Sequence, residues 1–198
     1  MQAPLLSSAY LPPVQYFQKI KDTGCFFVEK HEHYVKQSYR NRCNVFGANG
    51  MLALSIPVVH MSDKEIITDK KISHTENWQQ QHWRTIESSY RNSPYFIYYA
   101  DALQPFYQKK YTFLFDYNIE LMQFLLQSFK IKTDIKFTES FQKESENDLR
   151  YSIHPKNKLT EGEFKNYPQL FSDKHGFQPN LSCIDLLFNE GPYSKEYL

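Results

Sequence analysis

Apolar runs too short for helices bracket a segment of helical periodicity near the start of the chain. Residues 5–9 form a short, mainly apolar run and residues 25–28 a continuous one, and the two predict two buried strands. Residues 14–21 between them carry apolar side chains at helical spacing, and Gly24 follows, so this segment predicts a helix. A strand, a helix and a strand within about 25 residues are typical of a βαβ unit, which predicts a parallel sheet.

The next apolar runs have the pattern of a β-hairpin. Residues 42–46 and 51–56 are strand-like, and the Gly-Ala-Asn-Gly sequence at residues 47–50 separates them. An Asn-Gly pair is a strong turn signal, because both residues tolerate positive φ. The sequence therefore predicts an antiparallel excursion after the first βαβ unit.

Helical periodicity dominates the middle of the chain. Residues 77–91 predict a helix in which Asn77 is the N-cap and Gln80 its reciprocal partner. Residues 98–107 predict a second helix, bent at Pro105. Residues 113–129 predict a mostly buried helix, because its polar stripe is narrow.

Asn118 departs from the pattern of that buried helix. At about 100° per residue it lies opposite the polar stripe and faces the core. A buried amide without hydrogen bonds costs on the order of 1–3 kcal/mol. Asn118 is therefore expected either to brace a loop or to contact a ligand.

Two further elements complete the predicted fold. Residues 131–138 predict a strand, and residues 181–188 a short helix that ends at Gly191. The polar segment 139–150 is interpreted as solvated. The fold class is α/β, with a mainly parallel, Rossmann-like sheet, a β-hairpin excursion and a helical segment at about 77–129. We expect residues 1–198 to form a single domain.

Composition and charge argue against several classes of protein and partner. Hydrophobic residues make up 41% of the chain and aromatic residues 17%, so rings are expected to form much of the core, and the alternative is a groove lined with them. The formal net charge is only +1, which argues against nucleic acid as a partner. Three widely spaced cysteines fit neither a disulfide framework nor a zinc site, and favour reduced thiols and a cytoplasmic location. No leader and no apolar run of roughly 18 residues is present, so we expect no membrane span.

The densest group of candidate binding residues lies around Arg40. If this segment is extended, Arg40 and Arg42 point the same way and can grip one phosphate or carboxylate. Tyr10 and Asn41 are the neighbouring candidates for substrate contacts. The competing interpretation is a pair of surface arginines that are neutralised by nearby acids.

Histidines supply the candidate bases. His31 and His33 alternate with Glu29 after the second predicted strand, where open α/β sheets bind ligands. The same spacing suits a metal, but no third and fourth ligand is evident, so no metal or other cofactor is predicted. His82 is the third candidate base. A catalytic role for Cys43, whose pKa Arg42 could lower, is disfavoured because no base is evident.

Other candidates gather near the helix at 77–91 and in the last helix. A helix start favours anions, which makes His74 and Trp78 candidate binding residues, and their competing roles are capping and packing. Trp83 and Asn118 are added as substrate contacts. Asp185 is expected to orient a base or to cap a turn.

These segments, taken in order, resemble the WbqC-like family of bacterial proteins. The matching segments are residues 10–17 (YLPPVQYF), 34–42 (YVKQSYRNR), 54–58 (LSIPV), 78–83 (WQQQHW), 90–96 (YRNSPYF) and 179–188 (PNLSCIDLLF). The resemblance implies a role in surface polysaccharide (O-antigen) biosynthesis. It also implies transfer of a glycyl or other acyl group to a nucleotide-linked amino sugar.

The sequence leaves three candidate functions. The first is the acyl transferase just described, with the diphosphate against Arg40 and Arg42 and a histidine as the base. The second is a non-catalytic protein of the same pathway that binds a sugar or a partner. The third, binding of single-stranded nucleic acid through interleaved rings and bases, is disfavoured by the net charge.

Overall fold

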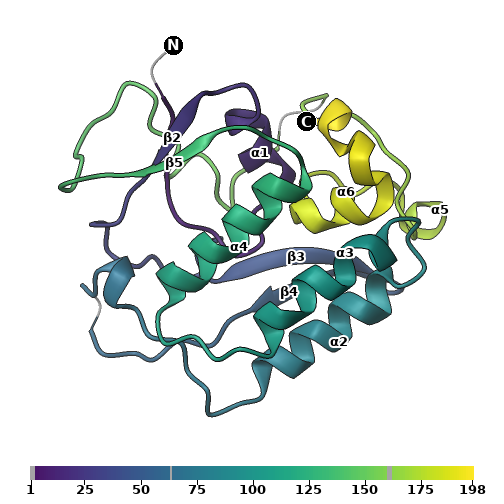
Figure 1. The fold of residues 1–198 in the computed structure, drawn as a ribbon, viewed down its shortest axis with the longest axis horizontal. Coiled ribbons are helices and arrows are strands. Elements are labelled where there is room, and N and C mark those ends of the chain that lie inside the picture. The colour runs from purple at the N-terminus through teal and green to yellow at the C-terminus, as the bar shows by residue number, and fades with distance from the viewer. Residues whose placement is uncertain (1–2, 63, 160–161) are drawn as a thin grey trace.

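A short parallel sheet forms one side of the protein (Figure 1). The computed structural model describes residues 3–62, 64–159 and 162–198. The sheet has the order β1–β2–β5, and both pairings are parallel. Helix α1 connects the first two strands, so the predicted βαβ unit and the parallel sheet are confirmed. The bounds are β1 Leu5–Leu6, α1 Val14–Ile20, β2 Cys25–Val28 and β5 Asp134–Phe137.

Strand β1 is shorter than residues 5–9, which the apolar run predicted. The run is buried throughout, but only Leu5 and Leu6 pair with β2. Beyond them the chain bends away, and the Tyr10 backbone N–H donates to the carbonyl of Tyr39 instead. On its other side β1 contacts a late segment, because the Leu5 N–H donates to the Asn147 carbonyl and the Leu5 carbonyl accepts from the Leu149 N–H.

The predicted hairpin is confirmed, with a tighter turn. Strands β3 (Arg42–Gly47) and β4 (Gly50–Ser55) are antiparallel, and Gly47 pairs with Gly50. Only residues 48–49 remain between the strands, whereas the sequence predicted four residues there. Gly50 has φ of +105°, a conformation that suits glycine.

The helical segment at about 77–129 is also confirmed. In Figure 1 helix α4 crosses the centre of the molecule, while α2 and α3 lie at the lower right beside the hairpin. A 3-10 turn containing Pro105 follows α3, where the sequence predicted a bend. The bounds are α2 Trp78–Tyr90, α3 Phe96–Leu103, the 3-10 turn Gln104–Tyr107 and α4 Leu114–Ser128.

The predicted capping role of Asn77 is wrong. Asn77 occupies the N-cap position of α2, but its side chain makes no cap hydrogen bond. Its amide Nδ2 donates to Gln80 Oε1 at 3.0 Å, so the two side chains bond each other rather than the helix backbone.

The remaining elements cover the core beside the hairpin. Helix α6 is buried along seven of its eight residues, and it ends at Gly191 as predicted. Gly191 has φ of +51°, and a Cβ there would lie 2.4 Å from the ring of Tyr95, so glycine is required. Among the described residues, no helix is long and apolar enough to cross a membrane. The remaining bounds are a 3-10 turn Ile67–Asp69, α5 Ser172–His175, α6 Cys183–Glu190 and a final 3-10 segment Gly191–Tyr197.

Candidate functional site

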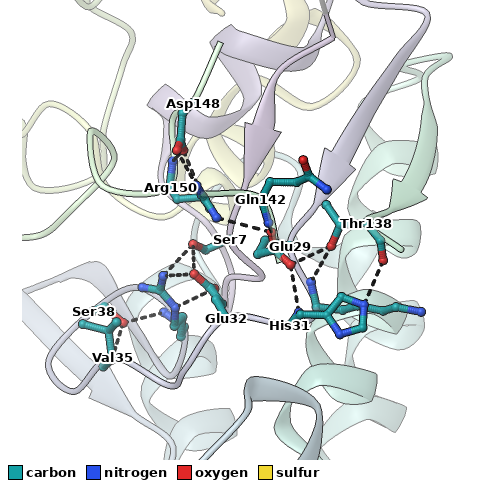
Figure 2. Close-up of polar contacts among 12 residues, drawn as sticks. Ser7, Glu29, His31, Glu32, Val35, Ser38, Thr138, Gln142, Asp148 and Arg150 are labelled. Atoms are coloured by element: carbon teal, nitrogen blue, oxygen red, sulfur yellow. Dashed lines mark hydrogen bonds and ion pairs between the residues drawn. The ribbon is translucent and has the colours of Figure 1, made fainter. Parts of the chain in front are cut away.

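Polar side chains from three strands meet at the carboxyl edge of the parallel sheet. Ser7 follows β1, Glu29 and Glu32 follow β2, and Thr138 follows β5. All four are buried, and the two glutamates are at most 1% exposed. Open α/β sheets bind their ligands at this edge. We call the residues that meet here, together with Arg40 and Arg150, the carboxyl-edge network (Figure 2).

Glu32 and Arg40 form one half of the network. Arg40 Nε donates to Glu32 Oε1 at 2.8 Å, and Arg40 Nη2 donates to Glu32 Oε2 at 2.5 Å. Arg40 Nη2 also donates to Ser7 Oγ at 2.6 Å, while the Ser7 hydroxyl donates to Glu32 Oε2 at 3.1 Å. A two-point carboxylate–guanidinium pair of this kind fixes the orientation of both groups.

Glu29 is the centre of the other half, as Figure 2 shows. Its Oε1 accepts from the Thr138 hydroxyl at 2.6 Å and from the His31 backbone N–H at 2.9 Å. Its Oε2 accepts from the Gln142 backbone N–H at 3.0 Å and from Arg150 Nη1 at 3.3 Å. Every oxygen of Glu29 therefore has a partner, which is what burial of an ionised carboxylate requires.

Arg150 connects Glu29 with Asp148. Its Nε and Nη2 donate to the two oxygens of Asp148 at 2.9 and 2.5 Å. These hydrogen bonds lower the pKa of Asp148, although burial opposes the effect. The segment at residues 139–150, interpreted above as solvated, thus contributes a buried guanidinium to the sheet edge.

A surface hollow of about 570 Å³ adjoins the network. Thr138 and Gln142 both line it and both bond Glu29, so the network and the hollow share a wall. Its volume lies within the roughly 300–1,000 Å³ that is usual for small-molecule pockets. Two rings and three carboxylates are among the side chains that line it: Phe27, Phe137, Glu139, Glu144 and Glu146.

Three of the predicted site residues, Tyr10, Trp78 and His82, lie in a buried aromatic cluster. The Tyr10 hydroxyl lies 2.9 Å from His82 Nδ1 and 2.9 Å from the Tyr107 hydroxyl. Trp78 and Tyr117 pack around them, with ring centroids 5.1 Å from His82 to Trp78 and 6.0 Å from Tyr10 to Tyr117. Burial lowers the pKa of His82 to about 4, so its imidazole is neutral at pH 7. We call these five residues the ring cluster.

The two arginines predicted to grip one ligand lie in different settings. Arg40 is buried in the carboxyl-edge network, whereas Arg42 begins β3 and its Nε donates to Ser55 Oγ at 3.2 Å on the surface. Asn41 between them donates to the Ile56 carbonyl at 2.8 Å and braces the hairpin. Asn118 donates to the Arg40 carbonyl at 2.7 Å, which is the loop-bracing alternative of its two predicted roles.

The predicted histidines are also separated. The Nε2–H of His31 donates to the Thr138 carbonyl at 3.2 Å, so His31 lies beside the network (Figure 2). It contacts Thr138, which lines the hollow, but His31 itself is not one of the lining residues. His33, two residues later, is exposed, and Glu29 is buried, so the three do not share a face. Among the described residues, no group of three His, Cys, Asp or Glu side chains could hold a metal ion.

The remaining candidates make structural contacts. His74 donates through Nε2 to the Tyr111 carbonyl at 2.8 Å. Trp83 packs against the rings of Phe96 and Tyr107. Burial raises the pKa of Cys43, the opposite of the effect that Arg42 was expected to have.

Asp185 is buried in the last helix and orients side chains rather than capping a turn. Its Oδ2 accepts from the Tyr167 hydroxyl at 2.7 Å and from Gln169 Nε2 at 2.9 Å. Burial raises its pKa to about 6, and these hydrogen bonds oppose the increase.

Sequence reasoning did not select four residues of the network: Ser7, Glu32, Thr138 and Arg150. Thr138 ends the predicted strand 131–138, so its position at the sheet edge was a usable signal. Glu32 follows β2 in the same way. Arg150 carried no such signal, because it lies in a polar, mixed-charge segment and reaches Glu29 from 121 residues away.

The fold and the site define an α/β protein with a small parallel sheet and a polar, partly buried site at its carboxyl edge. The chain belongs to the WbqC-like protein family, whose sequence profile matches residues 7–161. It is 24% identical over 229 aligned positions to the uncharacterized protein Rv1507c of Mycobacterium tuberculosis. That alignment covers 98% of this chain and 96% of the mycobacterial protein. No solved structure gave a significant match.

Proposed function

We propose that the protein is a transferase of surface polysaccharide (O-antigen) biosynthesis. It transfers a glycyl or other acyl group to the amino group of a nucleotide-linked amino sugar, at the carboxyl edge of the parallel sheet. The observation that carries this proposal is the hollow of about 570 Å³, which shares Thr138 and Gln142 with the carboxyl-edge network.

The lining of the hollow suits an aminated sugar. Aromatic rings such as Phe27 and Phe137 offer apolar faces to a sugar ring, and Glu139, Glu144 and Glu146 favour a cationic amine. The same three carboxylates disfavour a diphosphate in this hollow. The sugar and its amine therefore occupy the hollow, and the diphosphate lies elsewhere.

His31 is the best placed of the three candidate bases. His82 is buried in the ring cluster and His33 is exposed, whereas His31 is half-buried beside Thr138. Because Nε2–H donates to the Thr138 carbonyl, Nδ1 of neutral His31 carries the lone pair. In the proposed step the amine first loses the proton of its cationic form to solvent, and the neutral nitrogen then attacks the acyl carbonyl. A C–N bond forms, the bond between the carbonyl carbon and the leaving group breaks, and the leaving group departs with its electron pair. His31 Nδ1 takes the proton from the amine.

One observation favours a non-catalytic alternative. All four oxygens of Glu29 and Glu32 already accept hydrogen bonds, so neither buried carboxylate is free to act as a base. A sugar- or partner-binding protein of the same pathway would use the hollow in the same way, without turnover.

A ligand screen followed by a transfer assay tests the proposal. The first measurement is the melting temperature with UDP- and dTDP-amino sugars, acyl-CoAs, aminoacyl donors, ATP and divalent metals, because a ligand that binds only the folded state raises it. Mass spectrometry of mixtures of stabilising ligands then detects an acylated nucleotide sugar.

His31→Gln is the decisive variant, and His33→Gln is its matched control, two residues away and exposed. Loss of a general base lowers kcat by about 10²–10⁴-fold. We expect that loss in His31→Gln at an unchanged ligand-induced melting shift, and near-normal turnover in His33→Gln. Binding of an amino sugar without turnover in the wild-type protein would replace the transferase with the binding function.

A further inference from the structure

A second, smaller crevice opens beside the carboxyl-edge network. Its cavity volume is only about 10 Å³. That space is roughly what a single water molecule needs. Ser7, Ser8, Arg40 and Arg150 are among the residues that line the crevice.

The buried hydroxyl of Ser8 lacks a hydrogen-bond partner among the described residues. The Ser8 side chain is 2% exposed. The neighbouring Ser7 differs, because its hydroxyl bonds both Glu32 and Arg40. A buried hydroxyl without a partner costs roughly 1–3 kcal/mol, so a group that enters the crevice and accepts from Ser8 recovers that loss.

Two guanidiniums line the same crevice. Arg40 uses Nε and Nη2 for Glu32 and Ser7, so these contacts do not engage its Nη1. Arg150 is held at three nitrogens by Glu29 and Asp148. Because the carboxylates fix both planes, the guanidiniums act as oriented donors rather than as a diffuse positive field.

We propose that Ser8, Arg40 and Arg150 form a subsite for one oxyanion oxygen of the substrate. The space admits a single oxygen-sized group, so the rest of the ligand lies outside the crevice. This inference rests on the proposed function and deepens it: the oxyanion belongs either to the diphosphate of the nucleotide sugar or to the carboxylate of an acyl donor. Arg150, rather than the surface residue Arg42, is the second guanidinium.

Ser8→Ala tests the subsite, and Ser93→Ala is its matched control. Ser93 is also a buried serine whose Oγ has no partner among the described residues, and it does not line the crevice. Isothermal titration with pyrophosphate, glycine and a UDP-amino sugar is carried out on the wild-type protein and on both variants. Each variant removes an unpartnered hydroxyl, so neither is expected to lose thermal stability.

We expect Ser8→Ala to bind its oxyanion about tenfold more weakly, because a hydrogen bond to a charged group is lost, and Ser93→Ala to bind like the wild type. A loss for pyrophosphate assigns the subsite to the diphosphate, and a loss for glycine assigns it to the carboxylate. Equal binding by the wild-type protein and Ser8→Ala, or no binding of either small anion, would mean that the crevice holds an ordered water only and would overturn the inference. Weaker pyrophosphate binding by Ser8→Ala in a protein without transferase turnover would keep the subsite and reject the proposed function.

Discussion

The carboxyl-edge network and the ring cluster bury polar groups in opposite ways. In the network all four oxygens of Glu29 and Glu32 accept hydrogen bonds. In and beside the ring cluster, Trp78 Nε1, Tyr117 Oη and Asn118 Oδ1 are buried without partners in the described part of the chain. Both regions are almost completely shielded from solvent.

The difference follows from charge. An ionised carboxylate that lacks a partner in the interior costs far more than a neutral hydroxyl or indole N–H in the same position. Neutral groups can therefore remain unpaired within an aromatic core, while Glu29 and Glu32 cannot. The comparison teaches that complete pairing marks the charged network as rigid scaffolding, and that Ser8, a neutral hydroxyl beside it, can remain unpaired.

The largest expected effect comes from breaking the network at Arg40. Arg40→Met leaves Glu32 buried without its counter-ion, which costs about 3–5 kcal/mol of unfolding free energy. Urea denaturation monitored by circular dichroism measures the loss. Arg42→Met is the control, and at this surface position a change within about 0.5 kcal/mol is expected. Equal losses in the two variants would contradict the structural role of the Glu32–Arg40 pair.

The ring cluster is expected to respond to acid through His82. Its pKa falls from 6.5 in the unfolded chain to about 4 in the fold, so between these pH values the unfolded state binds a proton that the folded state does not. The unfolding free energy of the wild-type protein therefore carries no penalty from His82 above pH 6.5. It decreases by about 3 kcal/mol as the pH falls from 6.5 to 4.

Asp185 opposes that decline, because its pKa is raised to about 6 and its contribution therefore increases as pH falls through the same range. The informative quantity is thus the stability difference between wild type and His82→Gln, measured by urea denaturation from pH 7 to pH 4. We expect the deficit of His82→Gln to shrink by about 3 kcal/mol on acidification. A constant deficit would show that His82 is not protected from protonation.

The smallest expected effect is that of Tyr10→Phe in the ring cluster. It removes the hydroxyl that contacts both His82 and Tyr107, and it leaves neutral groups unpaired, so the expected loss is about 1–3 kcal/mol. Thermal and urea unfolding measure it. Tyr98→Phe, at a side chain that is 75% exposed, serves as the control. A loss as large as that of Arg40→Met would remove the distinction between charged and neutral burial.

Local patterns predicted the elements better than they predicted the site. The helix predicted at residues 113–129, the run at 25–28 and the hairpin signals match the observed elements closely, because each pattern depends on neighbours in sequence. The core-facing position of Asn118 also followed from helical spacing. Strand β1 ended early, because the competing contact of Tyr10 with Tyr39 is not local.

The site required information that no local pattern carries. Arg40 and Arg42 are two residues apart, yet one is buried against Glu32 and the other lies on the surface, because the chain between them enters a strand whose partner is Ser55. Arg150 looked like part of a solvated segment until the fold placed it beside Glu29. Long-range pairing of charges is a property of the tertiary structure, and composition alone does not indicate it.

The placement of β1 has a consequence for how the chain folds. Leu5 and Leu6 pair with β2 on one side, and Leu5 also hydrogen-bonds to Asn147 and Leu149 on the other. The strand therefore joins segments that lie far apart in the sequence. Closing such a long loop is slow, because its entropic cost precedes the contacts that offset it. During synthesis β1 leaves the ribosome early. Its edge opposite β2 stays unpaired until residues 147–149 have also been synthesised. The proposed oxyanion subsite contains Ser8 from one end of that loop and Arg150 from the other. It therefore forms late in folding.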